Sequence, residues 1–541
     1  MLQRNPSMLE ETTTGARKRL ERLIELERLL AADAKRVVRV VPSSNILDGL
    51  GSVLMHSQGN ASTYDLSKPA KVIPCFVSHS WATGRWDKTM ALAYYFHKWH
   101  AIALSTALLL LSISFVSMTA RPGLCMPPWE FGAWKSDVMR AALIPLLPGA
   151  AFLAATFYAH TLPGVSTDCF LDKVCIHQTN PALKKQAIDS LDLFLRFSRR
   201  MLVLWSPEYL TRLWCTYELA TFIKLHPDST MRIDIMPSWL PKYTLFMFVY
   251  CSVAMTVLPL LASGPGFAYA AAVMGGGYVG YISILSATLL LIVIPGTVFF
   301  YLKVAQHTQM LAQLRDFRVA DALCGNPRDV EFVHGLIEVM WSSSREANDG
   351  RERFEHFIRF ELASKLEANF GPRTRLPYLA SLISNLPVIA VCPMLALVCD
   401  AHMLELWGYM RPDGTPDLRS WAQRWSLYGL ELWCFVNPVA VVATQEALAW
   451  CIDARRGAAA CIVIGSLAYW MAMMPLIFLI VASVMYQPLQ IGASHTLGGA
   501  LLLGLLTLAC FPPERLRRLL GLDTGGRKSR DGTTLRSLKE H

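Results

Sequence analysis

The chain has 541 residues, of which 53% are hydrophobic and only 17% are charged, and its formal net charge is +10. A typical soluble domain carries about 25% charged residues, so this composition excludes one ordinary soluble domain and favours a polytopic membrane protein with soluble parts. Most basic residues fall between apolar blocks or in the tail, as in cytoplasmic loops beside anionic lipid. We therefore expect a lipid bilayer, and no nucleic acid, as a partner.

The first 69 residues are predicted to comprise a disordered start, an amphipathic helix and a linker. Residues 16–41 place Ala and Leu at alternating three- and four-residue steps among Arg, Lys and Glu, which predicts an amphipathic or short coiled-coil helix. This helix packs on its own domain, self-associates or lies on a lipid surface, and the pattern alone leaves these alternatives open. Residues 42–69 are rich in Ser, Gly and Asn, the composition of a linker.

Two uncharged blocks, residues 99–120 and 141–160, divide a module of soluble composition into two pieces. A helix rises ~1.5 Å per residue, so each block is long enough to cross a hydrocarbon core of ~30 Å. We predict a transmembrane hairpin over residues 99–160, which returns the chain to the side of the membrane that it left. Residues 70–98 and 161–240 would then assemble on one face.

The two segments that flank the hairpin are predicted to form one α/β domain. Short apolar runs predict strands, and longer runs with one apolar face predict helices. The strands are expected at residues 72–77, 170–176, 200–205 and 231–236, and the helices at residues 181–197 and 209–225. This alternation indicates a parallel, doubly wound sheet.

Further uncharged blocks bring the expected number of transmembrane helices to about eight. The remaining six are expected at residues 243–263, 278–302, 377–401, 428–450, 459–485 and 494–511. The chain then divides into a transmembrane pair within 241–302, a cytosolic helical segment at 303–376, four spans within 377–512 and a basic tail at 513–541. An even number of spans puts both termini in the cytosol, in agreement with the positive-inside rule.

Four short motifs in the split domain resemble the TIR (Toll/interleukin-1 receptor) family. They are FVSHSW at residues 76–81, FLDK at 170–173, LVLWSPEY at 202–209 and RLWCTYEL at 212–219. The resemblance covers residues 70–98 and 165–237. It implies a flavodoxin-like fold used in immune and cell-death signalling, and homotypic contacts between domains. The expected fold class is thus an α-helical polytopic membrane protein with a cytosolic, TIR-like parallel-sheet domain split by a transmembrane hairpin.

The resemblance also implies a catalytic residue. In enzymatically active members the glutamate of a WCxxEL motif serves NAD cleavage, and that glutamate would be Glu218, with NAD as a substrate rather than a cofactor. Cleavage of the bond to nicotinamide builds positive charge on the ribose, which a neighbouring carboxylate stabilises. Trp214 lies four residues earlier on the same helical face and is a candidate wall of the pocket. Ser78, His79 and Trp81 are candidates for its mouth.

Two alternatives stay open. In the first, Trp214 and its neighbours Tyr217 and Leu219 are packing residues, and Glu218 pairs at the surface with Arg212 or Lys224. In the second, the chain is a channel or transporter with a regulatory TIR-like domain. Glu446, an ionisable residue in the block at 428–450, is the intramembrane candidate for that function. The thirteen cysteines include no CxxC pair, so we expect neither a disulfide framework nor a bound metal.

Overall fold

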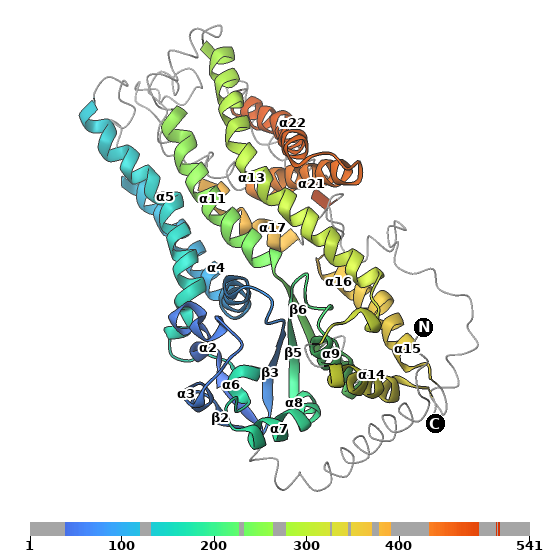
Figure 1. Ribbon diagram of the computed structural model, residues 1–541. Helices are drawn as coiled ribbons and strands as arrows, with labels where there is room; N and C mark the ends of the chain where they lie inside the picture. The colour runs from blue at the N-terminus through green and yellow to red at the C-terminus, as the bar shows by residue number, and fades with distance from the viewer. Residues whose placement is uncertain are drawn as a thin grey trace.

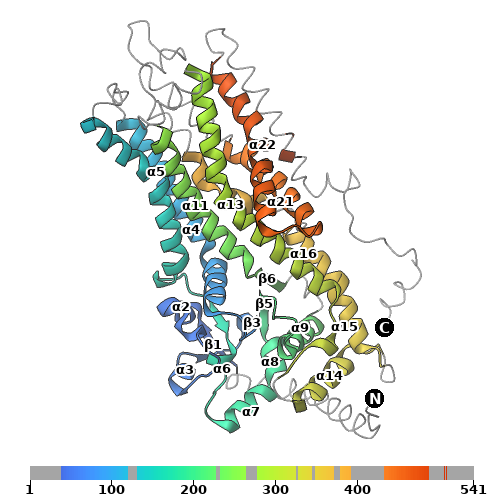
Figure 2. The ribbon, with the colours of Figure 1, turned by 45° about the horizontal axis from the view of Figure 1, so that its top comes forward.

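A computed structural model places an α/β domain at one end of the molecule and a bundle of long helices at the other (Figure 1). The view in Figure 2 shows the same division. The structure describes residues 38–119, 131–226, 232–262, 277–324, 327–343, 348–370, 378–390 and 432–485, with the single positions 505, 507 and 508. The helix expected at 16–41 and the span expected at 494–511 therefore lie almost wholly outside the described residues.

The α/β domain is built on a six-stranded sheet with the order β2-β1-β4-β3-β5-β6. The strands are β1 Arg39–Pro42, β2 Lys68–Pro69, β3 Ile73–His79, β4 Asp168–Phe170, β5 Ser198–Trp205 and β6 Ile233–Pro237. The four strands β4, β3, β5 and β6 are parallel, whereas β1 runs antiparallel to both of its neighbours. Within the parallel part the chain order is two, one, three, four, which is the flavodoxin-like order.

The sheet is mixed, whereas the sequence predicts a parallel one, because residues expected to form a linker contribute its far edge. Between β1 and β2 lie α2 Ser43–Gly51, the short η2 Ser52–Leu54 and α3 Ala61–Asp65. The Gly and Asn residues of this stretch form turns and cap a helix. Gly49 and Gly51 take positive φ values of 55° and 70°, and Asn60 caps α3 through a capping box. The composition that predicted a linker at residues 42–69 therefore comes from turns inside a folded domain.

The strand expected at 170–176 is also shorter than predicted. β4 ends at Phe170, and a single helical turn, α6 Asp172–Cys175, follows directly. Asp172 begins this turn and its Oδ1 accepts a 2.6 Å hydrogen bond from the backbone N–H of Lys173. A side chain of this kind favours turns and helix starts over strands, so the carboxyl end of β4 carries Asp172 toward the edge of the sheet.

Helices from two distant parts of the sequence cover the sheet. The domain itself supplies α7 Pro181–Asp189, α8 Leu191–Arg196 and α9 Leu213–Leu225. Residues 319–370 supply the other helices. These are η4 Val319–Asp321, α14 Pro327–Trp341, α15 Gly350–His356, the π-helical turn η5 Phe357–Leu362 and α16 Ala363–Phe370. Trp341 donates a 3.3 Å hydrogen bond to the carbonyl of Ala220 in α9, and Lys365 donates one of 2.7 Å to Ile233. The charged segment at 303–376 therefore packs on the α/β domain.

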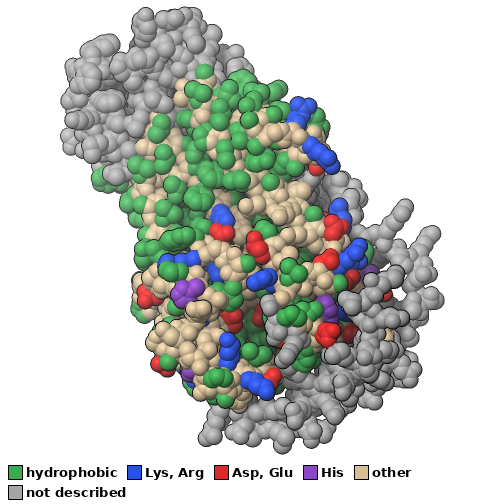
Figure 3. All heavy atoms as spheres, in the orientation of Figure 1, with side chains coloured by type: hydrophobic (Ala, Val, Ile, Leu, Met, Phe, Trp, Pro, Cys, Tyr) green, Lys and Arg blue, Asp and Glu red, His purple; other side chains and the backbone are tan. Residues whose placement is uncertain are grey.

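The helical part consists of long apolar rods that rise from the sheet. They include α4 Arg85–Thr119, α5 Phe131–Tyr158, α11 Trp239–Ala262, α13 Gly277–Arg315, α21 Asn437–Asp453 and α22 Ala458–Met485. Shorter pieces are η3 Ala159–Thr161, α17 Tyr378–Ser384, η6 Leu386–Ala390 and η7 Leu432–Val436. Hydrophobic side chains dominate the surface of this part, whereas most charged side chains gather over the α/β domain (Figure 3).

Four of these helical stretches, among the described residues, are long and apolar enough to cross a membrane. They are Arg85–Phe115, Trp239–Val257, Leu290–Arg315 and Leu432–Asp453. The blocks expected at 99–120 and 278–302 are each part of a longer continuous helix, α4 and α13, which extends beyond the apolar block toward the sheet. Much of the span expected at 377–401 lies outside the described residues, so the described residues contain four candidate spans by length and composition, and the expected eight are not shown.

The junction of α14 and α15 makes the cover over α9 testable. Gly350 is buried, and a Cβ atom there would lie 2.0 Å from the carbonyl oxygen of Glu338. Gly350→Ala should therefore destabilise the α/β domain by about 1–3 kcal/mol, seen as a lower midpoint of thermal unfolding in detergent. Gly457→Ala is the control, because no atom of the described residues lies within 4 Å of its Cβ position. Equal midpoints for the two variants would contradict this packing.

Candidate functional site

The best-placed cluster of polar side chains lies at the carboxyl edge of the parallel strands. The chain leaves β3 to form β4 on one side and later β5 on the other, so the order of strands reverses at β3. In open α/β sheets ligands bind outside the carboxyl ends of the strands at such a switch point. Ser78 and His79 are the last residues of β3, and they pair with Val203 and Leu204 of β5.

A carboxylate from α9 reaches this edge. Glu218 is partly exposed, and its Oε2 accepts a 2.6 Å hydrogen bond from the hydroxyl of fully buried Ser78. The hydroxyl of buried Tyr209 lies 2.7 Å from the same Ser78 oxygen. A serine hydroxyl has one proton to give, so when Ser78 donates to Glu218 it accepts from Tyr209. The three side chains form a directed relay that ends on the carboxylate.

The surroundings of Glu218 favour its neutral form. Burial raises its pKa to about 8, and the negative charge of Asp172 acts in the same direction, against the hydrogen bond from Ser78, which lowers the pKa. At this pKa, Glu218 is mostly protonated at pH 7. A positively charged group placed next to it would favour ionisation.

A second group of side chains lies beside the relay. The indole N–H of Trp81 donates a 2.8 Å hydrogen bond to Oδ2 of Asp172. The ring of His79 meets the Trp81 ring edge-on at 4.5 Å, and the ammonium nitrogen of Lys88 lies 4.3 Å from the Trp81 centroid. Burial lowers the pKa of His79, which keeps its ring neutral, and within the described part of the chain the ring's buried Nε2 has no hydrogen-bond partner. This group offers an aromatic surface, a cation and an unused ring nitrogen.

The segment at 42–69 supports this second group from behind. Lys173, which follows Asp172 in α6, is buried and donates hydrogen bonds of 2.8 and 2.7 Å to the carbonyls of Val53 and His56. The ammonium group therefore ties α6 to the stretch between β1 and β2. This tie fixes the position of Asp172, and through it the orientation of the Trp81 indole.

The structure brings together four of the five residues that the sequence proposed for an NAD site. Ser78, His79, Trp81 and Glu218 all lie at this edge. Trp214 is half-buried and packs edge-on against Tyr217, with ring centroids 5.8 Å apart. Its indole therefore belongs to the packing of α9.

The alternative in which the neighbours of Glu218 are packing residues and Glu218 pairs at the surface agrees with the structure only in part. Tyr217 and Leu219 are buried, as that alternative requires. Glu218, however, is bonded to Ser78 rather than to Arg212 or Lys224.

Sequence reasoning missed Asp172, Tyr209 and Lys88. Two of them stood in motifs that were visible in the sequence. Asp172 is the acidic residue of FLDK, two residues after the end of β4, and Tyr209 ends the SPEY turn, four residues after β5. A polar residue shortly after a buried strand was the available signal. Lys88 gave no signal of its own, since it is one cation among others at the start of an apolar helix.

The proposed intramembrane residue, Glu446, lies on α21 with an exposed side chain. Its neighbour Gln445 is fully buried.

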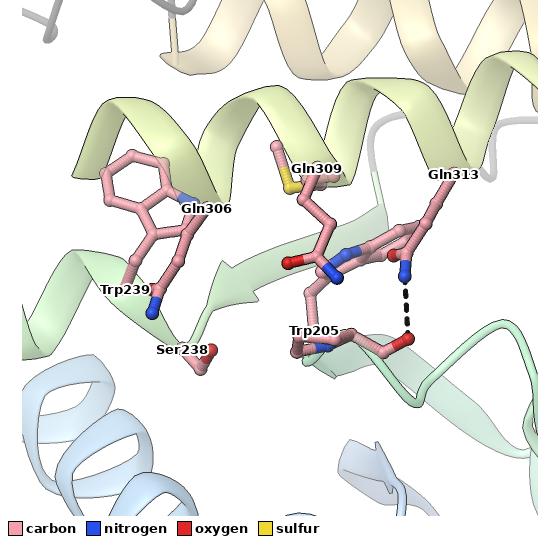
Figure 4. Close-up of a pocket in the computed structure, with 8 residues that line it drawn as sticks. Trp205, Ser238, Trp239, Gln306, Gln309 and Gln313 are labelled. Carbon is pink, nitrogen blue, oxygen red and sulfur yellow. Dashed lines mark hydrogen bonds between the residues drawn. The ribbon is translucent and has the colours of Figure 1, made fainter. Parts of the chain in front are cut away.

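A hollow lies further along the same edge of the sheet, between the ends of β5 and β6 and the overlying helix α13 (Figure 4). It encloses about 240 Å³ of empty space, including open solvent at its mouth. Its lining comprises Trp205, Pro207, Ser238, Trp239, Gln306, Gln309, Met310 and Gln313. Gln313 donates a 2.8 Å hydrogen bond to the carbonyl of Pro207 (Figure 4). The ring of Trp205 lies 5.6 Å from that of Tyr209, so the hollow adjoins the relay.

Comparison with protein families identifies one match: the model of the TIR domain matches residues 153–237. The matched range starts within α5, includes β4, β5, α9 and β6, and contains Glu218, whereas β3 lies outside it. Searches of curated proteins and of solved structures found no match.

The raised pKa of Glu218 predicts a pH-dependent effect of Glu218→Gln. Between the ordinary value of 4.5 and about 8, the folded protein holds a proton that the unfolded chain has lost. The free energy of unfolding of the wild type therefore falls as the pH rises through this range. The glutamine variant lacks this loss. Its free energy of unfolding at pH 8 should exceed that of the wild type by about 1–3 kcal/mol after allowance for partial exposure, seen as a higher thermal midpoint, and the gap should close toward pH 5.

The control is Glu361→Gln, a change of an exposed carboxylate on η5. A gap that is constant with pH, or that grows as the pH falls, would contradict the environment described for Glu218.

Proposed function

We propose that this chain, which carries a TIR domain, is a multi-pass membrane protein that displays the domain on the cytosolic face and cleaves NAD there. Four helices with the length and composition of membrane spans support the membrane part. The proposal puts both termini in the cytosol, because an even number of spans leaves the basic loops and tail on one face, which the positive-inside rule assigns to the cytosol. TIR domains commonly self-associate, so homotypic contact between displayed domains is the proposed signalling output.

The reaction is cleavage of the bond between the nicotinamide nitrogen and C1′ of the ribose. Nicotinamide takes the bonding electron pair and leaves as a neutral molecule, and the positively charged ribose is captured by water, which loses one proton. A carboxylate beside the sugar stabilises the charge that develops. Because the pyridinium ring of NAD is itself cationic, its arrival lowers the pKa of Glu218 and creates the carboxylate that the reaction requires.

The neighbouring residues have distinct roles in this proposal. Ser78 orients the carboxylate by its 2.6 Å hydrogen bond, and Tyr209 fixes the direction of that bond. His79 and Trp81 are proposed to contact the dinucleotide, since they lie at the same edge of the sheet. Trp214 is proposed only for the outer wall, because its indole packs on Tyr217.

One observation favours NAD cleavage at Glu218 over the alternative in which Glu218 only pairs at the surface. The only side-chain hydrogen bond that the described residues give Glu218 comes from Ser78, at the carboxyl end of β3. A residue kept for surface pairing would meet Arg212 or Lys224 on its own helix. Instead, the carboxylate is directed to the switch point of the sheet, where this fold class binds ligands.

The activity is tested by incubating the purified full-length protein in detergent with NAD and measuring released nicotinamide. The wild type should release nicotinamide, and Glu218→Ala should reduce the rate by about 10²–10³-fold, the usual cost of losing one electrostatic group in an active site. Glu361→Gln serves as the matched control and should retain the wild-type rate. No release by the wild type would exclude this reaction and leave a TIR domain that acts through assembly.

The pH profile tests the role of Ser78. Since the ionised carboxylate is the active form, kcat/KM should rise as the pH increases through about 8, the pKa of Glu218 in the free protein. The hydrogen bond from Ser78 lowers that pKa, so Ser78→Ala should move the rise to higher pH by up to about one unit. Ser78→Thr, which keeps the hydroxyl, should restore the original midpoint. A profile that falls with pH would rule out a carboxylate role for Glu218.

A further inference from the structure

The helix bundle contains buried polar side chains that pack against each other between α11, α13 and α21. Lys303 and His307 of α13 and Gln445 of α21 each have at most 1% of their surface exposed. The ammonium nitrogen of Lys303 donates a 2.9 Å hydrogen bond to Oε1 of Gln445. Trp239 of α11 stacks on the His307 ring at 5.2 Å, and its own ring lies 5.6 Å from the Lys303 nitrogen. We call Lys303, His307 and Gln445 the buried basic cluster.

Two members of the cluster have polar atoms without partners. Lysine can only donate, so the Gln445 oxygen must face Lys303 and the amide nitrogen must point elsewhere. That nitrogen is buried and has no hydrogen-bond partner among the described residues, and the same holds for both ring nitrogens of His307. An unsatisfied buried donor costs about 1–3 kcal/mol, and more than one beside a buried cation in an apolar bundle indicates a ligand.

The chemistry of the cluster selects the sign of that ligand. Its members present an ammonium group, an amide N–H₂ and an imidazole N–H, all of which donate hydrogen bonds. Glu446, whose negative charge acts on Lys303, is exposed, unlike the cluster. Donors that lie beside a positive charge favour an anion and disfavour a metal cation.

The hollow beside the sheet lies next to the cluster. Trp239 both lines the hollow and stacks on His307, so one side chain separates the two. Gln306 and Gln309 line the hollow from α13 (Figure 4), and Gln309 is exposed at its mouth. None of the described residues that line the hollow carries a charge.

We propose that Lys303, Gln445 and His307 bind a small monovalent inorganic anion between α13 and α21, with Trp239 as the barrier to the hollow. The proposal rests on the packing of the helix bundle and does not depend on the chemistry at Glu218. The probe is chloride, titrated into purified full-length protein in detergent against sodium gluconate at constant ionic strength.

In the wild type, chloride should raise the midpoint of thermal unfolding in a saturable manner, because a ligand that binds only the folded state stabilises it. Lys303→Gln keeps a polar side chain and removes the charge, and should weaken the apparent chloride affinity at least tenfold. Lys184→Gln, on the exposed face of α7, should leave it unchanged. Gln445→Met, of similar size, should also weaken chloride binding and serves if Lys303→Gln does not fold.

Identical midpoints in chloride and gluconate would overturn the proposal, as would chloride stabilisation that both cluster variants retain. Nicotinamide release is measured on the same preparations. The Lys303→Gln variant should release nicotinamide at the wild-type rate, with or without chloride. The two proposals can therefore fail separately.

Discussion

The pairing of β3 with β5 is the constraint on which the rest of the structure depends. The register runs from Ile73 opposite Ser198 to His79 opposite Leu204, although the whole of α4 and α5 lies between the two strands in sequence. Because α4 and α5 pack against each other, the long insertion brings its ends back together as a rigid pair rather than as an open loop. The entropy cost of closing a loop grows only slowly with its length in any case. This pairing places Ser78 at the edge where Glu218 arrives from α9.

The helix α13 connects the two ends of the molecule. Its first part belongs to the bundle, and its last turns lie over the carboxyl edge of the sheet, where Gln313 bonds to the carbonyl of Pro207. The chain after α13 then pairs with the start of α9: Leu323 donates to Thr211 at 2.7 Å and accepts from Leu213 at 3.0 Å. A displacement of α13 along its axis would therefore act on α9, the helix that carries Glu218. Two members of the buried basic cluster, Lys303 and His307, lie on this same helix.

The sequence predicted the parts of the fold that depend on local pattern. The alternation of apolar runs and amphipathic helices identified β3, β5, α9 and β6, and the WCxxEL motif identified Glu218. The edge strands β1 and β2 were missed because each is short and lies among turn residues such as Gly49 and Gly51, whose left-handed backbone is invisible in composition. The cover of α14 over α9 was missed because it joins segments that no local pattern connects.

The candidate site shows the same limit at the level of single residues. The choice of Glu446 over Gln445 followed from charge, yet neighbouring residues on a helix point about 100° apart, and the structure buries the uncharged one. Likewise, FLDK was recognised as a motif, but nothing in it showed that Asp172 would bond to Trp81, which comes from the other side of the hairpin. Residue type marks candidates for chemistry. The bonding partner and the burial of a side chain depend on how the tertiary structure brings distant segments together.

The protonated state of Glu218 bears on the selectivity of the proposed enzyme. An ionised carboxylate at this partly buried position would be costly without a partner, and the raised pKa shows that the fold avoids that cost by holding the proton. A substrate with a cationic ring favours loss of the proton, whereas the reduced dinucleotide, with its neutral ring, does not. The same carboxylate would then respond to the oxidised form alone. Discrimination between the two forms would thus follow from the electrostatics of one side chain, with no separate contact to the ring.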